Sequence, residues 1–197
     1  MNYQTDFDAL IFDCDGTLLD TMPIHYKAWS EVLLRHGIQF PVDRFYSLGG
    51  VPAANIITLL AGEQGITVDA EAVGWEKEHY FVELVEGKIE PIEAVVSIAR
   101  NTSQQLPMAV ATGSPTWLAE KMLAHSGLLP LFASIIGADK IQNPKPHPEP
   151  YLTAAQALGI DPTRCCAFED TDLGIESATA AGMTVVDVRS LAGYPGC

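Results

Sequence analysis

The chain has 197 residues, which is enough for one domain with a modest insertion but too few for two full-sized domains. Hydrophobic residues make up 48% and charged residues 18% of the sequence, a globular balance that excludes disordered and fibrous proteins. The formal net charge of -14 is spread along the chain, so nucleic acid and anionic membranes should be repelled, and neither is expected as a partner.

The cysteines and the N-terminal segment predict a cytoplasmic protein. The four cysteines, Cys14, Cys165, Cys166 and Cys197, follow no disulfide framework, and three lie in apolar stretches, which favours reduced and mostly buried thiols. Residues 1–8 lack the basic region of a secretory signal, and no run reaches the ~18 consecutive apolar residues of a membrane span. We also expect a monomer.

The first predicted element is a buried strand over residues 9–12, an apolar run that two aspartates and a glycine stop abruptly. From Thr21 onward, apolar positions recur at helical spacing, and further helices are predicted around residues 53–60 and 69–85. Between residues 19 and 87 the pattern predicts helices only.

Beyond Pro91 the pattern alternates between helices and strands, which is typical of a parallel α/β fold. The predicted helices cover residues 92–100, 116–126, 150–157 and 173–181, and the predicted strands cover residues 108–111, 133–136, 165–168 and 185–188. Because the carboxyl ends of parallel strands share one edge of the sheet, the polar residues that follow them should converge there. The last five residues, 193–197, are predicted to be a loose tail.

Two aspartates follow the first predicted strand. Asp13 and Asp15 are two residues apart on an extended backbone, so both side chains should point toward the same side. Such a pair can divide its work if a cation keeps one carboxylate ionised as a nucleophile while the other carries a proton. A solvated turn is the alternative interpretation of this pattern.

The second and third predicted strands are followed by groups that suit a phosphate. Thr112, Gly113 and Ser114 offer hydroxyls and free backbone N–H groups just before a predicted helix, although Ser114 could instead be the N-cap of that helix with Pro115 at its first position. Lys145 lies between two prolines, which would hold its positive charge on a stiff loop. A plain surface lysine is the alternative.

Three acids, Glu169, Asp170 and Asp172, follow the fourth predicted strand, residues 165–168. Carboxylate oxygens are the ligands that Mg²⁺ prefers. We expect Asp170 to bind the metal, Glu169 to lie near it, and Asp172 to act mainly as a helix N-cap. The groups that phosphoryl transfer needs, a nucleophile, phosphate-binding groups, a cation and metal acids, are thus all expected at the edge of the sheet where α/β enzymes bind ligands.

The order of these groups resembles the haloacid dehalogenase superfamily, subfamily I with a helical cap. The matching motifs are Asp13-x-Asp15-Gly16-Thr17, Thr112-Gly113-Ser114, Lys145-Pro146 and Glu169-Asp170-x-x-x-Gly174, and the match spans essentially the whole chain. The resemblance implies a Rossmann-like core with the first strand central, formed by residues 1–18 and 88–197, and an inserted four-helix cap over residues 19–87.

The resemblance also implies a mechanism. Asp13 would attack phosphorus to form an aspartyl phosphate, and Asp15 would protonate the leaving alkoxide and then activate water. Mg²⁺ would be bound by Asp13, the backbone carbonyl of Asp15 and Asp170, while Thr112 and Lys145 neutralise the transferring phosphoryl group. The presence of Asp15 argues against a dehalogenase.

Within the superfamily, residues 107–114 and 168–175 look most like bacterial fructose-1-phosphate phosphatases, which also take 6-phosphogluconate and are related to β-phosphoglucomutases. This resemblance implies a small phosphorylated sugar as the substrate, and it matches Thr21 and His25 to positions that steer Asp15.

Two alternatives stay open at this point. A β-phosphoglucomutase would need a positive charge on the cap, but the segment 49–55 has no arginine, and Arg44 and Lys77 cannot be placed from sequence. A non-catalytic phosphometabolite-binding protein is the second alternative.

Overall fold

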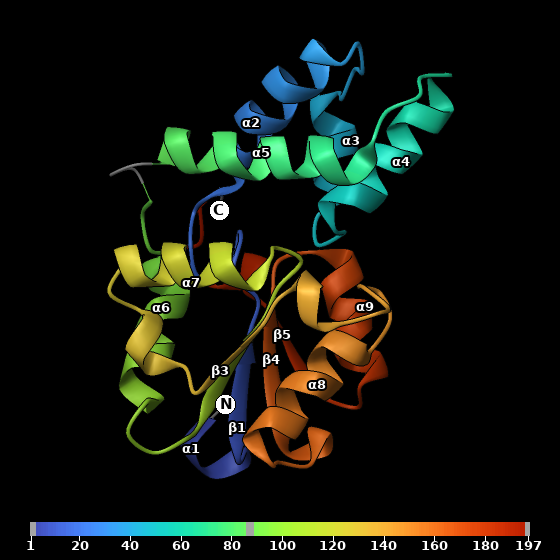
Figure 1. Cartoon of the computed structure of the whole chain (residues 1–197). Helices are drawn as coiled ribbons and strands as arrows, with labels where there is room; N and C mark the ends of the chain where they lie inside the picture. The colour runs from blue at the N-terminus through green and yellow to red at the C-terminus, as the bar shows by residue number, and fades with distance from the viewer. Residues whose placement is uncertain (1–2, 86–88, 196–197) are drawn as a thin grey trace.

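The computed structural model describes residues 3–85 and 89–195 (Figure 1). Its centre is a parallel sheet of β1 (Ala9–Phe12), β2 (Met108–Ala111), β3 (Ser134–Ile136), β4 (Cys165–Glu169) and β5 (Thr184–Asp187), in the order β3-β2-β1-β4-β5. All four residues of β1 are fully buried, as expected for a central strand covered on both faces. The predicted parallel α/β sheet with a central first strand is confirmed.

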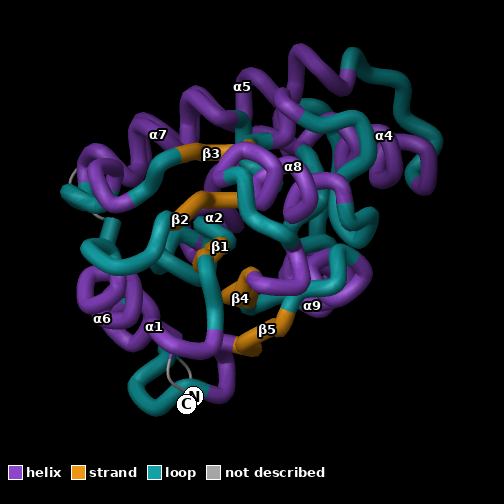
Figure 2. Tube along the Cα trace, turned by 90° about the horizontal axis from the view of Figure 1, so that it is seen from below, coloured by secondary structure: helices purple, strands orange, loops and turns teal. Residues whose placement is uncertain are grey.

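Helices cover both faces of the sheet (Figure 2). One face packs against α6 (Glu93–Thr102) and α7 (Thr116–His125), and the other packs against α8 (Glu149–Leu158) and α9 (Asp172–Ala180). A short helix, α1 (Tyr3–Asp6), precedes β1 and was not predicted. Single turns of 3-10 helix lie at Leu129–Leu131, Ala138–Lys140, Pro162–Arg164 and Val188–Ser190.

Alternation along the strands divides the core into two apolar clusters. Phe12 points to the α6 and α7 side, where its ring stacks on Phe168 of the neighbouring strand at 4.5 Å between centroids. Ile11 points to the opposite side and packs in a cluster with Tyr151 and Ala154 of α8. Burial on both faces therefore fixes the register of the strands, because a slip of one residue would exchange the two clusters.

Four helices lie above the carboxyl edge of the sheet and form a layer of their own, here called the helical insertion (Figure 1). They are α2 (Met22–Arg35), α3 (Val42–Ser47), α4 (Ala53–Glu63) and α5 (Ala70–Val85). Their apolar faces share a separate cluster that includes Trp29, Phe45, Ile57 and Leu60. Residues 48–52, the Gly-Gly loop, connect α3 to α4.

The helical insertion agrees with the helix-only pattern, but its details differ from the sequence expectation. The six-residue α3 was not found by periodicity, because a helix this short carries less than two turns of pattern. The expected domain boundaries at residues 18/19 and 87/88 stay a prediction, and residues 87 and 88 lie outside the described part of the chain. No helix in the described residues is both long enough and apolar enough to cross a membrane.

The predicted loose tail is wrong for the described part of that segment. Tyr194 is partly buried against the apolar cluster of the α6 and α7 face, and its hydroxyl donates a 2.8 Å hydrogen bond to the carbonyl oxygen of Gly16. The last described residues therefore return to the segment that follows β1.

Candidate active site

The carboxyl ends of the strands bring the predicted residues together. Asp13 follows β1 directly, Thr112 follows β2, and Glu169 is the last residue of β4. Lys145 reaches the same place from the loop between β3 and α8. The expectation that polar residues would converge at this edge is met by the fold, since all the strands are parallel.

Asp13 and Lys145 form a buried ion pair. The Nζ atom of Lys145 lies 2.7 Å from Oδ1 of Asp13 and also donates to Oε1 of Glu169, and only 1% of the Lys145 side chain is exposed. Burial favours the neutral amine, but the carboxylates of Asp13 and Glu169 outweigh it and raise the pKa of Lys145 well above its usual value. Lys145 is thus a fixed positive charge beside Asp13 and no surface lysine.

Glu169 has protein donors on both carboxylate oxygens. Oε1 accepts from Lys145 and from the hydroxyl of Tyr151 at 3.1 Å, while Oε2 accepts from the backbone N–H of Thr171 at 2.9 Å and from its hydroxyl at 3.0 Å. In this arrangement the carboxylate orients Lys145 and the start of α9.

An acidic cluster surrounds Asp13. Asp13, Glu169 and Asp170 each offer a carboxylate oxygen within 4.8 Å of the other two. Burial and the charge of Glu169 raise the pKa of Asp170 to about 7. Burial also raises the pKa of Asp13, and the charges of Glu169 and Asp170 add to this effect, while Lys145 opposes it. Three converging carboxylates share one ammonium group, so their chemistry fits a hard divalent cation such as Mg²⁺.

Gly16 makes room for this cluster. Its φ angle is +87°, and a Cβ atom at this position would lie 2.3 Å from Oδ2 of Asp170. Oδ1 of Asp170 in turn accepts a 2.8 Å hydrogen bond from the hydroxyl of Thr17. Gly16 and Thr17 of the first motif therefore position the carboxylate of Asp170.

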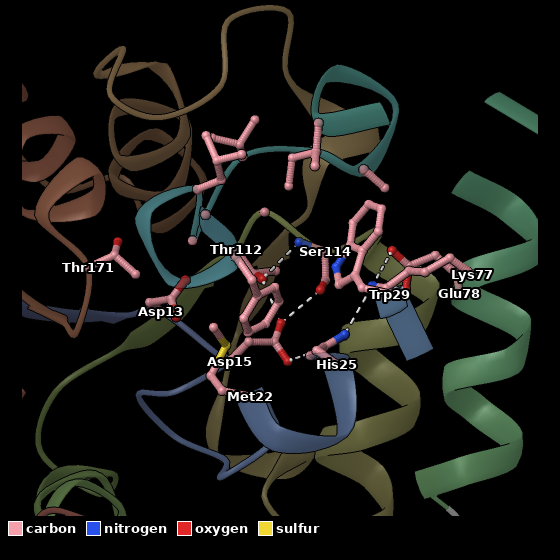
Figure 3. A pocket seen from close by; sticks show the side chains of 18 residues that line it. Asp13, Asp15, Met22, His25, Trp29, Lys77, Glu78, Thr112, Ser114 and Thr171 are labelled. Carbon is pink, nitrogen blue, oxygen red and sulfur yellow. Dashed lines mark hydrogen bonds and ion pairs between the residues drawn. The ribbon is translucent and has the colours of Figure 1, made fainter. Parts of the chain in front are cut away.

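Asp15 lies in a different environment (Figure 3). Its Oδ1 accepts a 2.7 Å hydrogen bond from the Thr21 hydroxyl and lies 3.0 Å from Nε2 of His25, while its Oδ2 accepts a 2.7 Å bond from the Ser114 hydroxyl. Burial alone would raise the pKa of Asp15, but these donors, His25 first among them, hold it below its usual range. The carboxylate is therefore ionised in this orientation.

His25 links Asp15 to the helical insertion. Its Nδ1 lies 3.0 Å from Nζ of Lys77, and its ring stacks on Phe81 at 3.8 Å between centroids. Because an ammonium group can only donate, Nδ1 accepts and Nε2–H donates to Asp15. The sequence alone did not show whether Lys77 or Arg44 lies near the site. Lys77 lies in the pocket, whereas Arg44 pairs with Glu63 at the surface.

Ser114 is not the N-cap that its position suggested. Helix α7 begins at Thr116, Pro115 takes the N-cap position, and the backbone N–H of Thr116 donates to Oδ1 of Asp139. This leaves the Ser114 hydroxyl for Asp15 and its backbone N–H for the Thr112 hydroxyl, which accepts at 3.0 Å.

Asp172 is not an N-cap either. Thr171 caps α9, and its hydroxyl accepts from the backbone N–H of Gly174 at 3.0 Å. Asp172 is the first helical residue, and its exposed carboxylate pairs with Arg189 at 2.9 Å. The prediction erred by one residue because threonine and aspartate are both favoured caps.

A pocket joins the strand ends to the helical insertion (Figure 3). Asp13, Asp15 and residues 112–114 line it from the sheet, and α2, the Gly-Gly loop and α5 line it from the insertion. Sequence reasoning missed Trp29 and Glu78, which face this pocket. The spacing of four residues between His25 and Trp29 could have indicated a shared helix face.

Known proteins resemble this chain over most of its length. A family model described as haloacid dehalogenase-like hydrolase matches residues 7–182. The fructose-1-phosphate phosphatase YqaB of Escherichia coli is 40% identical over 185 residues, which are 94% of this chain and 98% of that protein. A phosphorylated carbohydrates phosphatase of Thermotoga maritima is 31% identical over 180 residues, 89% of this chain and 82% of the relative.

A solved structure shares the whole architecture. The crystal structure of a β-phosphoglucomutase from Clostridium difficile superposes with a TM-score of 0.82 at 26% identity, and the match covers 95% of each chain. The expected family and fold are thereby confirmed, as is the expectation of an enzyme. The chain belongs to the haloacid dehalogenase-like hydrolase family, and its enzymatic class is phosphoric monoester hydrolase.

Proposed function

We propose that this protein is a Mg²⁺-dependent phosphatase that hydrolyses small sugar phosphates, of the fructose 1-phosphate and 6-phosphogluconate type, through an aspartyl phosphate on Asp13. The observation that carries the proposal is the buried Asp13, which lies 2.7 Å from Lys145 inside the acidic cluster and lines the same pocket as Asp15. The names of the relatives from Escherichia coli and Thermotoga maritima support a phosphorylated carbohydrate as substrate.

The metal would be held by Asp13, the backbone carbonyl of Asp15 and Asp170, with Glu169 close by. Bound there, Mg²⁺ supplies positive charge that keeps Asp13 ionised and offsets the charge of the phosphoryl oxygens. Glu169 contributes mainly through Lys145, since its own oxygens already accept from protein donors.

In the first step a carboxylate oxygen of Asp13 forms a bond to phosphorus, and the bond from phosphorus to the sugar oxygen breaks. Lys145, the Thr112 hydroxyl and the backbone N–H of Gly113 stabilise the charge that spreads over the phosphoryl oxygens. The sugar oxygen leaves with a proton from Asp15. In the second step Asp15 takes a proton from water, whose oxygen displaces Asp13 from phosphorus and releases inorganic phosphate.

Asp15 must move to different hydrogen-bond partners before it can protonate the leaving sugar oxygen. Bonded to Thr21, His25 and Ser114 it is ionised and can only accept a proton. Delivery of a proton to the leaving oxygen therefore requires Asp15 to leave at least some of these donors and to protonate before it reaches the substrate.

The test is phosphate release with Mg²⁺ from fructose 1-phosphate, 6-phosphogluconate and β-glucose 1-phosphate, with glucose 6-phosphate assayed in parallel. Phosphate that disappears in Asp13→Asn and with chelator supports the proposal. Glucose 6-phosphate without free phosphate would instead identify a mutase. Binding of these compounds without any turnover would favour the non-catalytic alternative.

A further inference from the structure

The end of the pocket away from Asp13 carries two opposite charges side by side (Figure 3). Lys77 and Glu78 are consecutive residues of α5, both line the pocket, and they are only 3% and 6% exposed. Charged side chains rarely tolerate such burial unless they are paired. The pair is therefore a feature of the substrate-facing surface.

The ammonium group of Lys77 has its partners within the protein. Nζ lies 3.1 Å from each carboxylate oxygen of Glu78, 3.0 Å from Nδ1 of His25 and 4.8 Å from the centre of the Trp29 ring. Among the described residues that line the pocket, Lys77 is the only lysine or arginine. Its charge is cancelled by Glu78, so this end of the pocket has no net positive charge to offer a second anionic group.

The carboxylate of Glu78 retains acceptor capacity. An ionised carboxylate can accept about four hydrogen bonds. Within the described parts of the chain, Lys77 is the one donor recorded for Glu78. The remaining lone pairs suit O–H donors, which a sugar supplies, and repel carboxylate or phosphate oxygens.

We infer that Glu78 sets the specificity of this pocket for monophosphates whose far end is uncharged and bears hydroxyl groups. It does so by neutralising Lys77 and by accepting hydrogen bonds from those hydroxyls. The inference rests on the proposed function and narrows it: alditol and ketose monophosphates are the preferred substrates, whereas bisphosphates and phosphorylated sugar acids such as 6-phosphogluconate are hydrolysed less efficiently.

The test uses two open-chain substrates that differ only at carbon 1, glucitol 6-phosphate with a hydroxymethyl group and 6-phosphogluconate with a carboxylate. The wild-type enzyme should prefer glucitol 6-phosphate in kcat/KM by at least about tenfold, since the Glu78 carboxylate repels a like charge in the pocket. Glu78→Gln uncovers the charge of Lys77, and this preference should shrink by about tenfold or reverse.

Two further variants control the experiment. Glu83→Gln makes the same change at an exposed position of the same helix, and its preference should equal that of the wild type. Glu78→Asp keeps the charge and should restore most of the preference. The inference is overturned if Glu78→Gln leaves the ratio of the two kcat/KM values within about twofold of the wild-type ratio, or if the wild type prefers 6-phosphogluconate.

A binding measurement separates this inference from the proposed function. Calorimetric titration of Asp13→Asn with the two compounds, with and without Glu78→Gln, gives a ratio of Kd values that needs no turnover. If no compound releases phosphate, the proposed function fails, and a Kd ratio that Glu78→Gln shifts toward the carboxylate still supports the role of Glu78. An unshifted Kd ratio overturns that role.

Discussion

Asp13 and Asp15 are two residues apart, yet their surroundings push their pKa values in opposite directions. Asp13 is packed among carboxylates that raise its pKa, whereas Asp15 is bonded by donors that lower its own. Environments of this kind assign different tasks to two chemically identical groups. The side chains diverge because one reaches the acidic cluster and the other reaches α2 and the segment before α7.

We expect Asp15→Asn to lower kcat by about 10²- to 10⁴-fold, because an amide can neither give the leaving oxygen a proton nor take one from water. The Mg²⁺ dependence should change little, since the backbone carbonyl of residue 15 is kept. Steady-state phosphate release over a series of Mg²⁺ concentrations measures both. The control is Asp43→Asn, at an exposed position of α3, and a loss in Asp15→Asn no larger than in this control would contradict the assignment.

At the scale of elements, the Gly-Gly loop touches the core directly at the site. A Cβ atom on Gly113 would lie 2.6 Å from the carbonyl oxygen of Gly50 and 2.9 Å from its carbonyl carbon. These are backbone atoms, so a side chain at residue 113 could be accommodated only if the loop moved away from the strand end.

Gly113→Ala should therefore lower kcat/KM for sugar phosphates by at least about tenfold, because the pocket would no longer close over the substrate. Its melting temperature should change far less than its activity. Gly62→Ala, in α4 with no atom within 4 Å of the added Cβ, is the matched control and should keep full activity. Equal activities of the two variants would show that the loop does not need its present position.

The N-terminus of helix α7 is capped by a side chain from the 3-10 turn Ala138–Lys140, which is distant in sequence. Oδ1 of Asp139 accepts from the backbone N–H of Thr116 at 2.6 Å and from its hydroxyl at 2.8 Å. This capping lowers the pKa of Asp139 despite the opposing effect of burial. The segment after β3 thereby fixes the helix that follows Thr112 and Ser114.

Asp139→Ala should destabilise the protein by about 1 kcal/mol, the usual cost of removing an N-cap acceptor. Asp139→Asn keeps an oxygen acceptor and should lose less. Urea unfolding followed by circular dichroism measures the differences, with Glu120→Ala on the exposed face of α7 as control. If Asp139→Ala is no less stable than Glu120→Ala, the capping contributes nothing measurable.

These examples show what periodicity can predict and what it cannot. The strands and the long helices were predicted to within a few residues, because apolar spacing reflects which face is buried. The start of α7 at Thr116 was predicted as well, but its capping group was not, since Asp139 lies 23 residues further along the chain. For Ser114 the sequence consequently left two roles open, phosphate binding and helix capping, and did not predict its hydrogen bond to Asp15. In the same way, Lys77 could be placed only after α5 was packed against α2.

The four motifs at the strand ends were recognisable because parallel topology alone brings them together. The pocket residues of the helical insertion were not, because their distance from Asp13 depends on how two layers pack. The interaction between Tyr194 and Gly16 spans 178 positions of sequence and leaves no local signal. The sequence therefore predicted which residues gather at the edge of the sheet, but not which residues of the helical insertion or of the C-terminal segment pack against that edge.

At the scale of the whole molecule, the acidic cluster makes stability depend on pH and metal together. The pKa of Asp170 rises from 3.8 to about 7 on folding. Between these two values the folded chain binds more protons than the unfolded chain at this group, so the free energy of unfolding falls as pH rises. The destabilisation is complete above about pH 7, where the carboxylate is charged in both states.

In chelator, the melting temperature should therefore decline from about pH 5 to pH 7 more steeply in the wild type than in Asp170→Asn, which cannot ionise at this position. Added Mg²⁺ should raise the melting temperature of the wild type by an amount that grows over the same interval, reaching at least about 4 °C. Scanning calorimetry at several pH values measures both effects. Parallel curves for the two proteins would contradict the assignment of Asp170.

The hydrogen bond from Tyr194 to Gly16 also decides how the protein should be handled. It holds the last described residues beside the segment that carries Asp13 and Asp15, whereas α1 lies at the other edge of the sheet (Figure 1). A fluorophore or surface linker attached to a cysteine introduced at Pro195 would therefore stand on the side of the molecule that carries these two aspartates. The same group attached to a cysteine introduced at Thr5, an exposed position of α1, would lie at the opposite end and keep the site accessible.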